Sequence, residues 1–122
     1  MLRPLREALA GGTSLGDAWL GVDHAAGWLV GSVGLYRVPE PGVLVLGYSV
    51  YPTLERQGYA SEMAWWAMQR AAESGAHVLR ATIPHGHFAS MTVARRAGLQ
   101  HVGETFDAEL GMDVLVFERR FS

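Results

Sequence analysis

Three apolar runs in the first half of the chain have the composition of β-strands. They lie within residues 18–22, 27–36 and 42–51 and are rich in valine, leucine and aromatic residues, which fit the pleated, partly buried surface of a strand. Short segments at 24–27 and 39–42 separate the runs, and the second of them is the turn sequence Pro-Glu-Pro-Gly. The pattern therefore predicts an antiparallel meander of three strands.

After Gly58 the spacing of the apolar positions changes from that of a strand to that of a helix. Alanine recurs every three or four residues, so that one face of a helix would carry a stripe of small side chains. The stripe consists of Ala60, Ala64, Ala67 and Ala71. Good helix formers fill the rest of the segment, and Gly75 is a typical stop signal. We expect a helix over residues 59–74.

Shorter elements of both kinds are expected in the rest of the chain. Residues 78–83 alternate and predict a strand, residues 87–97 predict a second helix, and residues 100–104 and 114–118 predict the last two strands. Residues 2–10 could begin with a short helix or a short strand, and the sequence leaves both open. The order of three strands, helix, strand, helix and two strands indicates an α/β domain around one mixed sheet.

Length and composition fit a single globular domain over residues 1–122. The chain is 49% hydrophobic and 18% charged, which is too apolar for disorder. A net charge of −2 gives no footprint for nucleic acid, and the lack of cysteine excludes disulfides and thiolate chemistry. The longest apolar stretch, residues 43–51, is far shorter than a membrane span, and the first ten residues do not resemble a signal peptide. We expect a cytoplasmic protein without nucleic-acid or membrane partners.

The junction between the third strand and the first helix is the candidate binding site. The first N–H groups of a helix have no intrahelical partner, and the helix dipole adds positive potential there. Gly58 would let a ligand approach the backbone closely, Ala60 is small, and Arg56 adds positive charge. These features predict a phosphate-binding loop, although helices that bind nothing often begin in the same way. The sequence has neither the nucleotide P-loop motif nor the spaced glycines of a dinucleotide fold.

Three separated blocks of the sequence resemble the GNAT superfamily of N-acetyltransferases. GYSVYPTLERQGYASEM resembles its strand, loop and helix signature, and QGYASE within it looks much like the branch that acetylates the N-termini of ribosomal proteins. PHGHFASMTVARRAGLQHVGE resembles the Asn-x-x-Ser helix of that branch, and GMDVLVFERRF its closing strand. The resemblance implies a GNAT-like acyl-CoA N-acyltransferase domain of the α/β (α+β) class. Its central sheet would be mixed and mostly antiparallel, with two main helices and a reduced N-terminal strand and helices.

The resemblance also implies an activity, which is acetyl transfer from acetyl-CoA to a primary amine such as a protein N-terminus or a small amine. Backbone groups of Val50 and Tyr51 would bind the pantetheine arm, and the strands before and after the first helix would splay apart to admit it. Tyr48 and Tyr59 border this cleft and would either line it or serve packing. The N–H groups that would hold the pyrophosphate belong to Arg56, Gln57, Gly58, Tyr59, Ala60 and Ser61.

Two residues at the start of the second helix would lie near the thioester. Ser90 matches the serine that is thought to protonate the leaving CoA thiolate in that branch. His87 replaces the usual asparagine and is a candidate base for the amine, because the ordinary pKa of histidine lies near working pH. The glutamate that many members carry on the strand before the loop is Val45 here, and Glu55 stands where glutamine or arginine is usual.

Two alternatives to an enzyme follow from these departures. About 17 residues precede Ala18, where the family normally has a strand and two helices that wall the acceptor site. A non-catalytic acyl-CoA-binding module would explain the missing glutamate and this short segment. A GNAT-like interaction domain without a cofactor would explain why Glu55 stands beside the expected pyrophosphate.

Several other groups have more than one interpretation. His85 and His87 form an H-x-H pair without a clear third ligand, so we expect no metal. Trp65 and Trp66 cannot both face the core, so one would be partly buried or would lie at the contact of a homodimer. Acidic residues near the last two strands would receive a cationic amine or would simply be solvated. They are Glu104, Asp107, Glu109 and Asp113.

Overall fold

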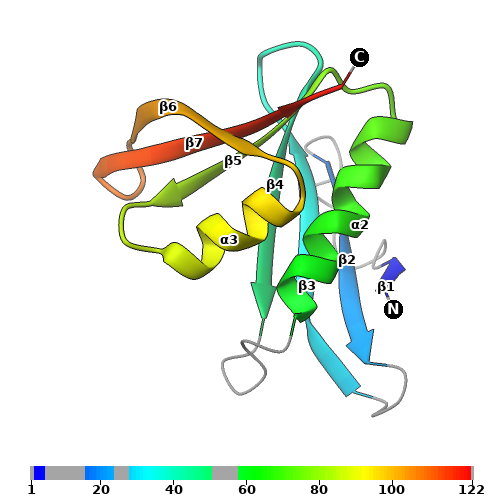
Figure 1. The fold of residues 1–122 in the computed structure, drawn as a ribbon. Helices are drawn as coiled ribbons and strands as arrows, with labels where there is room; N and C mark the ends of the chain where they lie inside the picture. The colour runs from blue at the N-terminus through cyan, green and yellow to red at the C-terminus, as the bar shows by residue number, and fades with distance from the viewer. Residues whose placement is uncertain (1, 5–15, 24–27, 51–57, 122) are drawn as a thin grey trace.

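Seven strands form one sheet in the part of the chain that the computed structural model describes, which covers residues 2–4, 16–23, 28–50 and 58–121 (Figure 1). The order of the strands in the sheet is β1-β2-β3-β4-β5-β7-β6. The strands are β1 (Leu2–Pro4), β2 (Gly16–Asp23), β3 (Trp28–Arg37), β4 (Val43–Val50), β5 (Val78–Pro84), β6 (Gln100–Asp107) and β7 (Met112–Arg120). The helices in the described residues are α2 (Tyr59–Glu73) and α3 (Phe88–Arg96).

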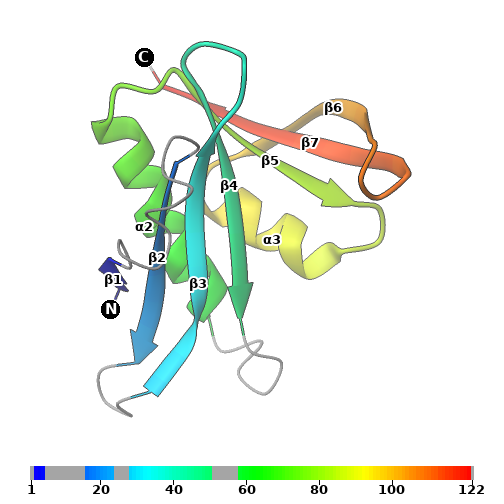
Figure 2. The ribbon, with the colours of Figure 1, turned by 180° about the vertical axis from the view of Figure 1, so that it is seen from behind.

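Neighbouring strands of this sheet are antiparallel, with the exception of β4 and β5. The parallel ladder between these two is short, because it joins only residues 43–45 to residues 78–80. Beyond the ladder the two strands run apart, and both ribbon views place α3 between their diverging ends (Figures 1 and 2). The predicted mixed, mostly antiparallel sheet is confirmed, and the strands on either side of α2 splay as expected.

The three-strand meander and both predicted helices are confirmed. β2, β3 and β4 follow one another in antiparallel register. Each helix is slightly shorter than the sequence predicted, because Ser74 caps α2, and His87 and Ala97 cap α3. At the start of the chain the strand alternative holds for Leu2–Pro4, while residues 5–10 lie outside the described residues.

The last two strands are longer than predicted, and the turn between them explains the difference. β6 and β7 remain paired as far as Asp107 and Met112. Oδ1 of Asp107 accepts hydrogen bonds from the N–H groups of Glu109 and Leu110, at 2.9 and 3.0 Å. This side-chain turn closes the hairpin between Asp107 and Met112, beyond the predicted ends of the two strands. Cross-strand pairing therefore extends both strands through residues that carry no alternating pattern.

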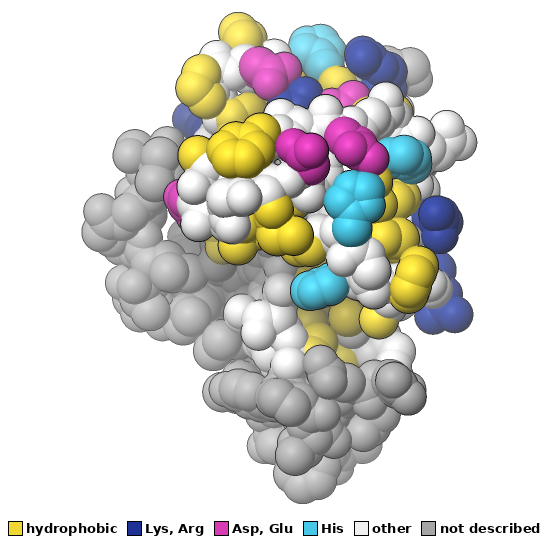
Figure 3. Space-filling view, turned by 90° about the vertical axis from the view of Figure 1, so that its left-hand side faces the viewer, with side chains coloured by type: hydrophobic (Ala, Val, Ile, Leu, Met, Phe, Trp, Pro, Cys, Tyr) yellow, Lys and Arg dark blue, Asp and Glu magenta, His cyan; other side chains and the backbone are white. Residues whose placement is uncertain are grey.

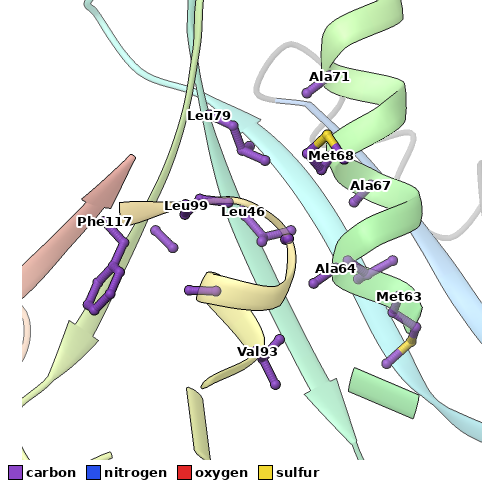
Figure 4. Close-up of a cluster of buried hydrophobic side chains, with 14 of the residues drawn as sticks. Leu46, Met63, Ala64, Ala67, Met68, Ala71, Leu79, Val93, Leu99 and Phe117 are labelled. Atoms are coloured by element: carbon purple, nitrogen blue, oxygen red, sulfur yellow. The ribbon is translucent and has the colours of Figure 1, made fainter. Parts of the chain in front are cut away.

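The hydrophobic core lies between the sheet and the two helices (Figure 4). The alanine stripe of α2 lies on its buried face, together with Met63 and Met68. Because alanine is small, the helix can pack closely on β3 and β4. On the α3 side of the core, Phe117 of β7 is fully buried. The two adjacent tryptophans diverge as expected, since Trp66 packs partly buried against the core and Trp65 is exposed.

A partly buried arginine holds the paired end of β4 and β5. Arg80 stands opposite Val45 at the last position of their ladder. Its Nε donates to Glu118 of β7 at 2.7 Å, and its two terminal nitrogens donate to Glu40 at 2.7 and 3.1 Å. Glu40 lies in the turn before β4, and the hydrogen bond and charge of Arg80 lower the pKa of its carboxyl group. The network therefore fixes the turn, β5 and β7 together where the ladder is intact.

Phe117 provides a direct test of the core. Phe117→Ala should lower the free energy of unfolding by about 3–5 kcal/mol, because the fully buried ring would leave a cavity. Phe106→Ala is the matched control, since that ring is 64% exposed on β6. It should change stability by less than about 0.5 kcal/mol. Urea unfolding followed by circular dichroism measures both values, and equal losses would contradict this description of the core.

Candidate functional site

A cavity of about 530 Å³ opens beside the unpaired end of β4. It is lined by residues 48–50 of β4, by residues 58–61 at the start of α2 and by one face of α3. The lining residues of α3 are Ala89, Ser90, Thr92, Val93 and Arg96. Because the ladder with β5 ends at Val45, the part of β4 that lines the cavity has no ladder partner on that side.

The start of α2 faces this cavity with its backbone accessible. Gly58 is the N-cap residue, and its φ of +85° lies in the left-handed region that glycine adopts without strain. A Cβ at Gly58 would meet no atom of the described residues within 4 Å. Glycine has no side chain that could cap the helix, and the first N–H groups of a helix have no intrahelical acceptor. The helix dipole adds positive potential, so this end of the cavity suits an anion.

Arg96 adds a positive charge on the exposed side of the cavity. It lies in the last turn of α3, and its Nη1 donates to Oγ of Ser61 in the first turn of α2 at 3.4 Å. The contact holds a guanidinium group beside the N-terminal end of α2. Guanidinium and phosphate form strong charge-assisted hydrogen bonds, so the two elements together favour a phosphate group at this place.

A hydrogen bond also crosses the cavity on its more buried side. The hydroxyl of Tyr48 donates to the carbonyl oxygen of Ser90 at 3.3 Å. Burial raises the pKa of Tyr48 above its ordinary value. Tyr48 both lines the cavity and packs against the core, and Tyr59 lines the cavity as well. The cavity therefore has an exposed end suited to anions and a partly buried end at Ser90.

Six of the ten site residues predicted from the sequence line this one cavity. They are Val50, Gly58, Tyr59, Ala60, Ser61 and Ser90. Tyr51, Arg56 and Gln57 lie outside the described residues. His87 is exposed at the N-cap of α3, makes no side-chain capping bond and is not among the lining residues. The fold therefore brings Ser90 to the same cavity as the start of α2, across a wide separation in sequence.

Sequence analysis missed the lining face of α3 and the position of Arg96. Counting from Ala89, the lining residues include those at i+3, i+4 and i+7, which share one face of a helix. This spacing around Ser90 could have revealed the face. It could not have separated Arg96 from Arg95, because both looked like residues of a helix end. Only the tertiary structure turns Arg96 toward α2, while Arg95 lies over the ring of Phe117 at 5.6 Å.

The histidines and acidic residues around β6 lie on the surface. Nε2 of His85 is 3.4 Å from Oε1 of Glu104, and both side chains are about half exposed. Figure 3 shows acidic, histidine and hydrophobic side chains close together on this face of the molecule. Among the described residues, no group of three or more His, Cys, Asp or Glu side chains could hold a metal ion. Neither α2 nor α3 is long and apolar enough to cross a bilayer.

A protein-family model matches most of the chain. The acetyltransferase (GNAT) domain model matches residues 3–100, a segment that includes every lining residue of the cavity named above. A comparison of the sequence with curated proteins finds no match.

Solved acetyltransferase structures share the fold. Ribosomal-protein-S5-alanine acetyltransferase from Vibrio fischeri has a TM-score of 0.77 at 15% identity, covering 93% of this chain and 65% of that one. A ribosomal L7/L12 alpha-N-protein acetyltransferase in complex with coenzyme A has a TM-score of 0.78 at 20% identity, covering 93% and 67%. IAA acetyltransferase from Bacillus cereus has a TM-score of 0.81 at 11% identity, covering 99% of both chains. These TM-scores show a common fold, and the chain spans about two thirds of the two ribosomal-protein enzymes.

The anion-binding end of the cavity can be tested with inorganic pyrophosphate. Gly58→Asp would put a carboxylate at the start of α2, so the rise in thermal midpoint that pyrophosphate causes should disappear. Gly75→Asp is the matched control, because it has φ of +86° and open space at the other end of the same helix. It should keep the pyrophosphate response. The same response in both variants would exclude the start of α2 as the anion site.

Proposed function

The chain belongs to the GNAT acetyltransferase family, and from that membership we propose that it transfers an acetyl group from acetyl-CoA to a primary amine. One observation carries the proposal: a single cavity joins the start of α2, the unpaired part of β4 and Ser90 of α3. The transfer needs a phosphate site, a strand edge for the pantetheine amides and a proton donor near the thioester. The three elements supply one each.

Acetyl-CoA would lie in the cavity with its phosphates at the exposed end. The N–H groups of residues 58–61 and the guanidinium of Arg96 would hold the phosphates. The backbone of β4 beyond Val45 has no ladder partner on the β5 side. Its N–H and C=O groups can therefore bond the pantetheine amides as another strand would. The proposal also includes backbone contacts from Tyr51 to the pantetheine arm and from Arg56 and Gln57 to the pyrophosphate.

The reaction forms an amide bond and breaks a thioester. The neutral amine attacks the thioester carbonyl, the C–N bond forms, and CoA leaves as its thiolate when the C–S bond breaks. The amine loses a proton and the thiolate gains one. We assign the donation to the hydroxyl of Ser90, which lies in the cavity lining. His87, the exposed N-cap residue of α3 that lies outside the cavity lining, is the proposed acceptor of the proton from the amine.

Among primary amines, a protein N-terminus is the acceptor that the similarities favour. Two of the structurally similar proteins are named for the acetylation of ribosomal proteins. A small amine is the alternative. A cytoplasmic location also belongs to the proposal. So does a homodimer, since β6 lies at the edge of the described sheet and most of its residues are exposed. Two copies could pair along such an edge.

Ser90→Ala tests the assigned proton donor. It should lower kcat for acetylation by about 100-fold and leave the Kd for acetyl-CoA almost unchanged, because the hydroxyl acts in the chemical step. The measurement is release of CoA thiol with a panel of peptides and small amines. Ser74→Ala is the control, since its hydroxyl bonds the carbonyl of Ala71 at the far end of α2. A wild-type protein that binds acetyl-CoA but acetylates no amine of the panel would overturn the proposed function.

Arg96→Ala tests the proposed phosphate contact. The loss of one charge-assisted contact should weaken acetyl-CoA binding by about tenfold in calorimetric titration. Arg95→Ala removes the same charge from the neighbouring position, where the guanidinium lies over Phe117 and does not line the cavity. It should bind acetyl-CoA like the wild type. Equal weakening by both variants would mean that net charge, and not the position of Arg96, determines affinity.

A further inference from the structure

The start of α3 is not joined to β4 by strand pairing, and side chains hold it there; among them Met91 and Ala94 are buried in the core. The ladder that would tie the two halves of the sheet ends at Val45, well before the part of β4 that faces α3. The N-cap residue of α3, His87, makes no side-chain capping bond. Figure 2 shows α3 crossing the gap between the ends of β4 and β5. The placement of Ser90, one turn into this helix, therefore depends on side-chain contacts.

Tyr48 makes such a contact directly with Ser90. It lies on the same face of β4 as Leu46, whose side chain is buried in the core, and its own ring packs against that core. Its hydroxyl reaches the carbonyl oxygen of Ser90 at 3.3 Å in a partly buried setting. Burial also raises the pKa of this hydroxyl. It therefore stays protonated, and able to donate, throughout the neutral pH range.

We propose that Tyr48 is a positioning residue, which fixes the first turn of α3 so that the Ser90 hydroxyl meets the leaving thiolate. The inference rests on the proposed function, because it needs Ser90 to donate a proton. The aromatic ring of Tyr48 packs against the core, and its hydroxyl donates to the backbone carbonyl of Ser90. Removal of the hydroxyl alone should therefore leave the fold intact and disturb only the placement of Ser90.

A double-mutant cycle between Tyr48 and Ser90 tests this role. Tyr48→Phe keeps the ring and should lower kcat by about tenfold, with the KM for acetyl-CoA changed less than about twofold, since small displacements of a reacting group are costly. In the Ser90→Ala background the same substitution should lower kcat by less than about twofold, because the carbonyl that Tyr48 binds remains but the hydroxyl that it positions is already gone. Loss of the same factor in both backgrounds, or no loss in the wild-type background, overturns the proposal.

Tyr36→Phe is the matched control, since it removes a tyrosine hydroxyl from a residue on β3 that is 44% exposed. It should leave kcat unchanged in both backgrounds. Amide hydrogen exchange supplies a reading that is independent of activity. Tyr48→Phe, but not Tyr36→Phe, should speed exchange in residues 88–94 by about three- to tenfold, as expected for one lost hydrogen bond.

The two measurements separate this inference from the proposed function. A wild-type protein without transferase activity would overturn the proposed function, and hydrogen exchange would still show whether Tyr48 holds the first turn of α3. Unchanged hydrogen exchange in Tyr48→Phe would show that the Tyr48 hydroxyl does not fix the first turn of α3, and it overturns the proposal whatever the activity of the wild type. Faster exchange together with the non-additive cycle supports both parts of the proposal.

Discussion

The parallel pairing of β4 with β5 ends after three residues, and the candidate site depends on this early separation. If β4 and β5 were paired along their whole length, the N–H and C=O groups of β4 would all be bonded within the sheet, and no opening would remain beside the strand. At the paired end, Arg80 binds Glu40 and Glu118 and thereby fixes the turn before β4, β5 and β7 together. With that end held, the strands diverge on one side only, and the unpaired part of β4 lines the cavity.

Small residues bring the start of α2 to the same opening. The alanine stripe of this helix is buried against the sheet, so its axis can approach β3 and β4 closely. Gly58 begins the helix in a left-handed conformation, and no described residue lies within 4 Å of the place that a Cβ would take. Small residues at chosen positions thus serve both purposes: alanines on the buried face let the helix pack closely, and glycine at its start leaves the first turn accessible.

The hydrogen bonds at the two ends of the cavity differ in burial, and this difference would orient the acetyl-CoA of the proposal. On the exposed side, the contact between Arg96 and Ser61 brings positive charge to the start of α2. On the partly buried side, Tyr48 reaches Ser90 across the gap. Burial of highly charged phosphates costs much free energy, so they favour the exposed end, whereas a thioester is less polar and can be buried at a lower cost. The proposed path of acetyl-CoA, with its phosphates outside and its thioester inside, follows from that contrast.

The sequence by itself determined the meander, both helices and the helix start at Gly58, because strand and helix periods and a helix start are local properties. The strand ends predicted from the sequence were less exact for β6 and β7, because cross-strand pairing and the Asp107 turn extend these strands. Only the tertiary structure decided where β4 leaves β5, and that Arg96 rather than Arg95 faces Ser61. It also brought Tyr48 to Ser90, 42 residues away in sequence. These features arise from the packing of distant segments against one core, which no local pattern encodes.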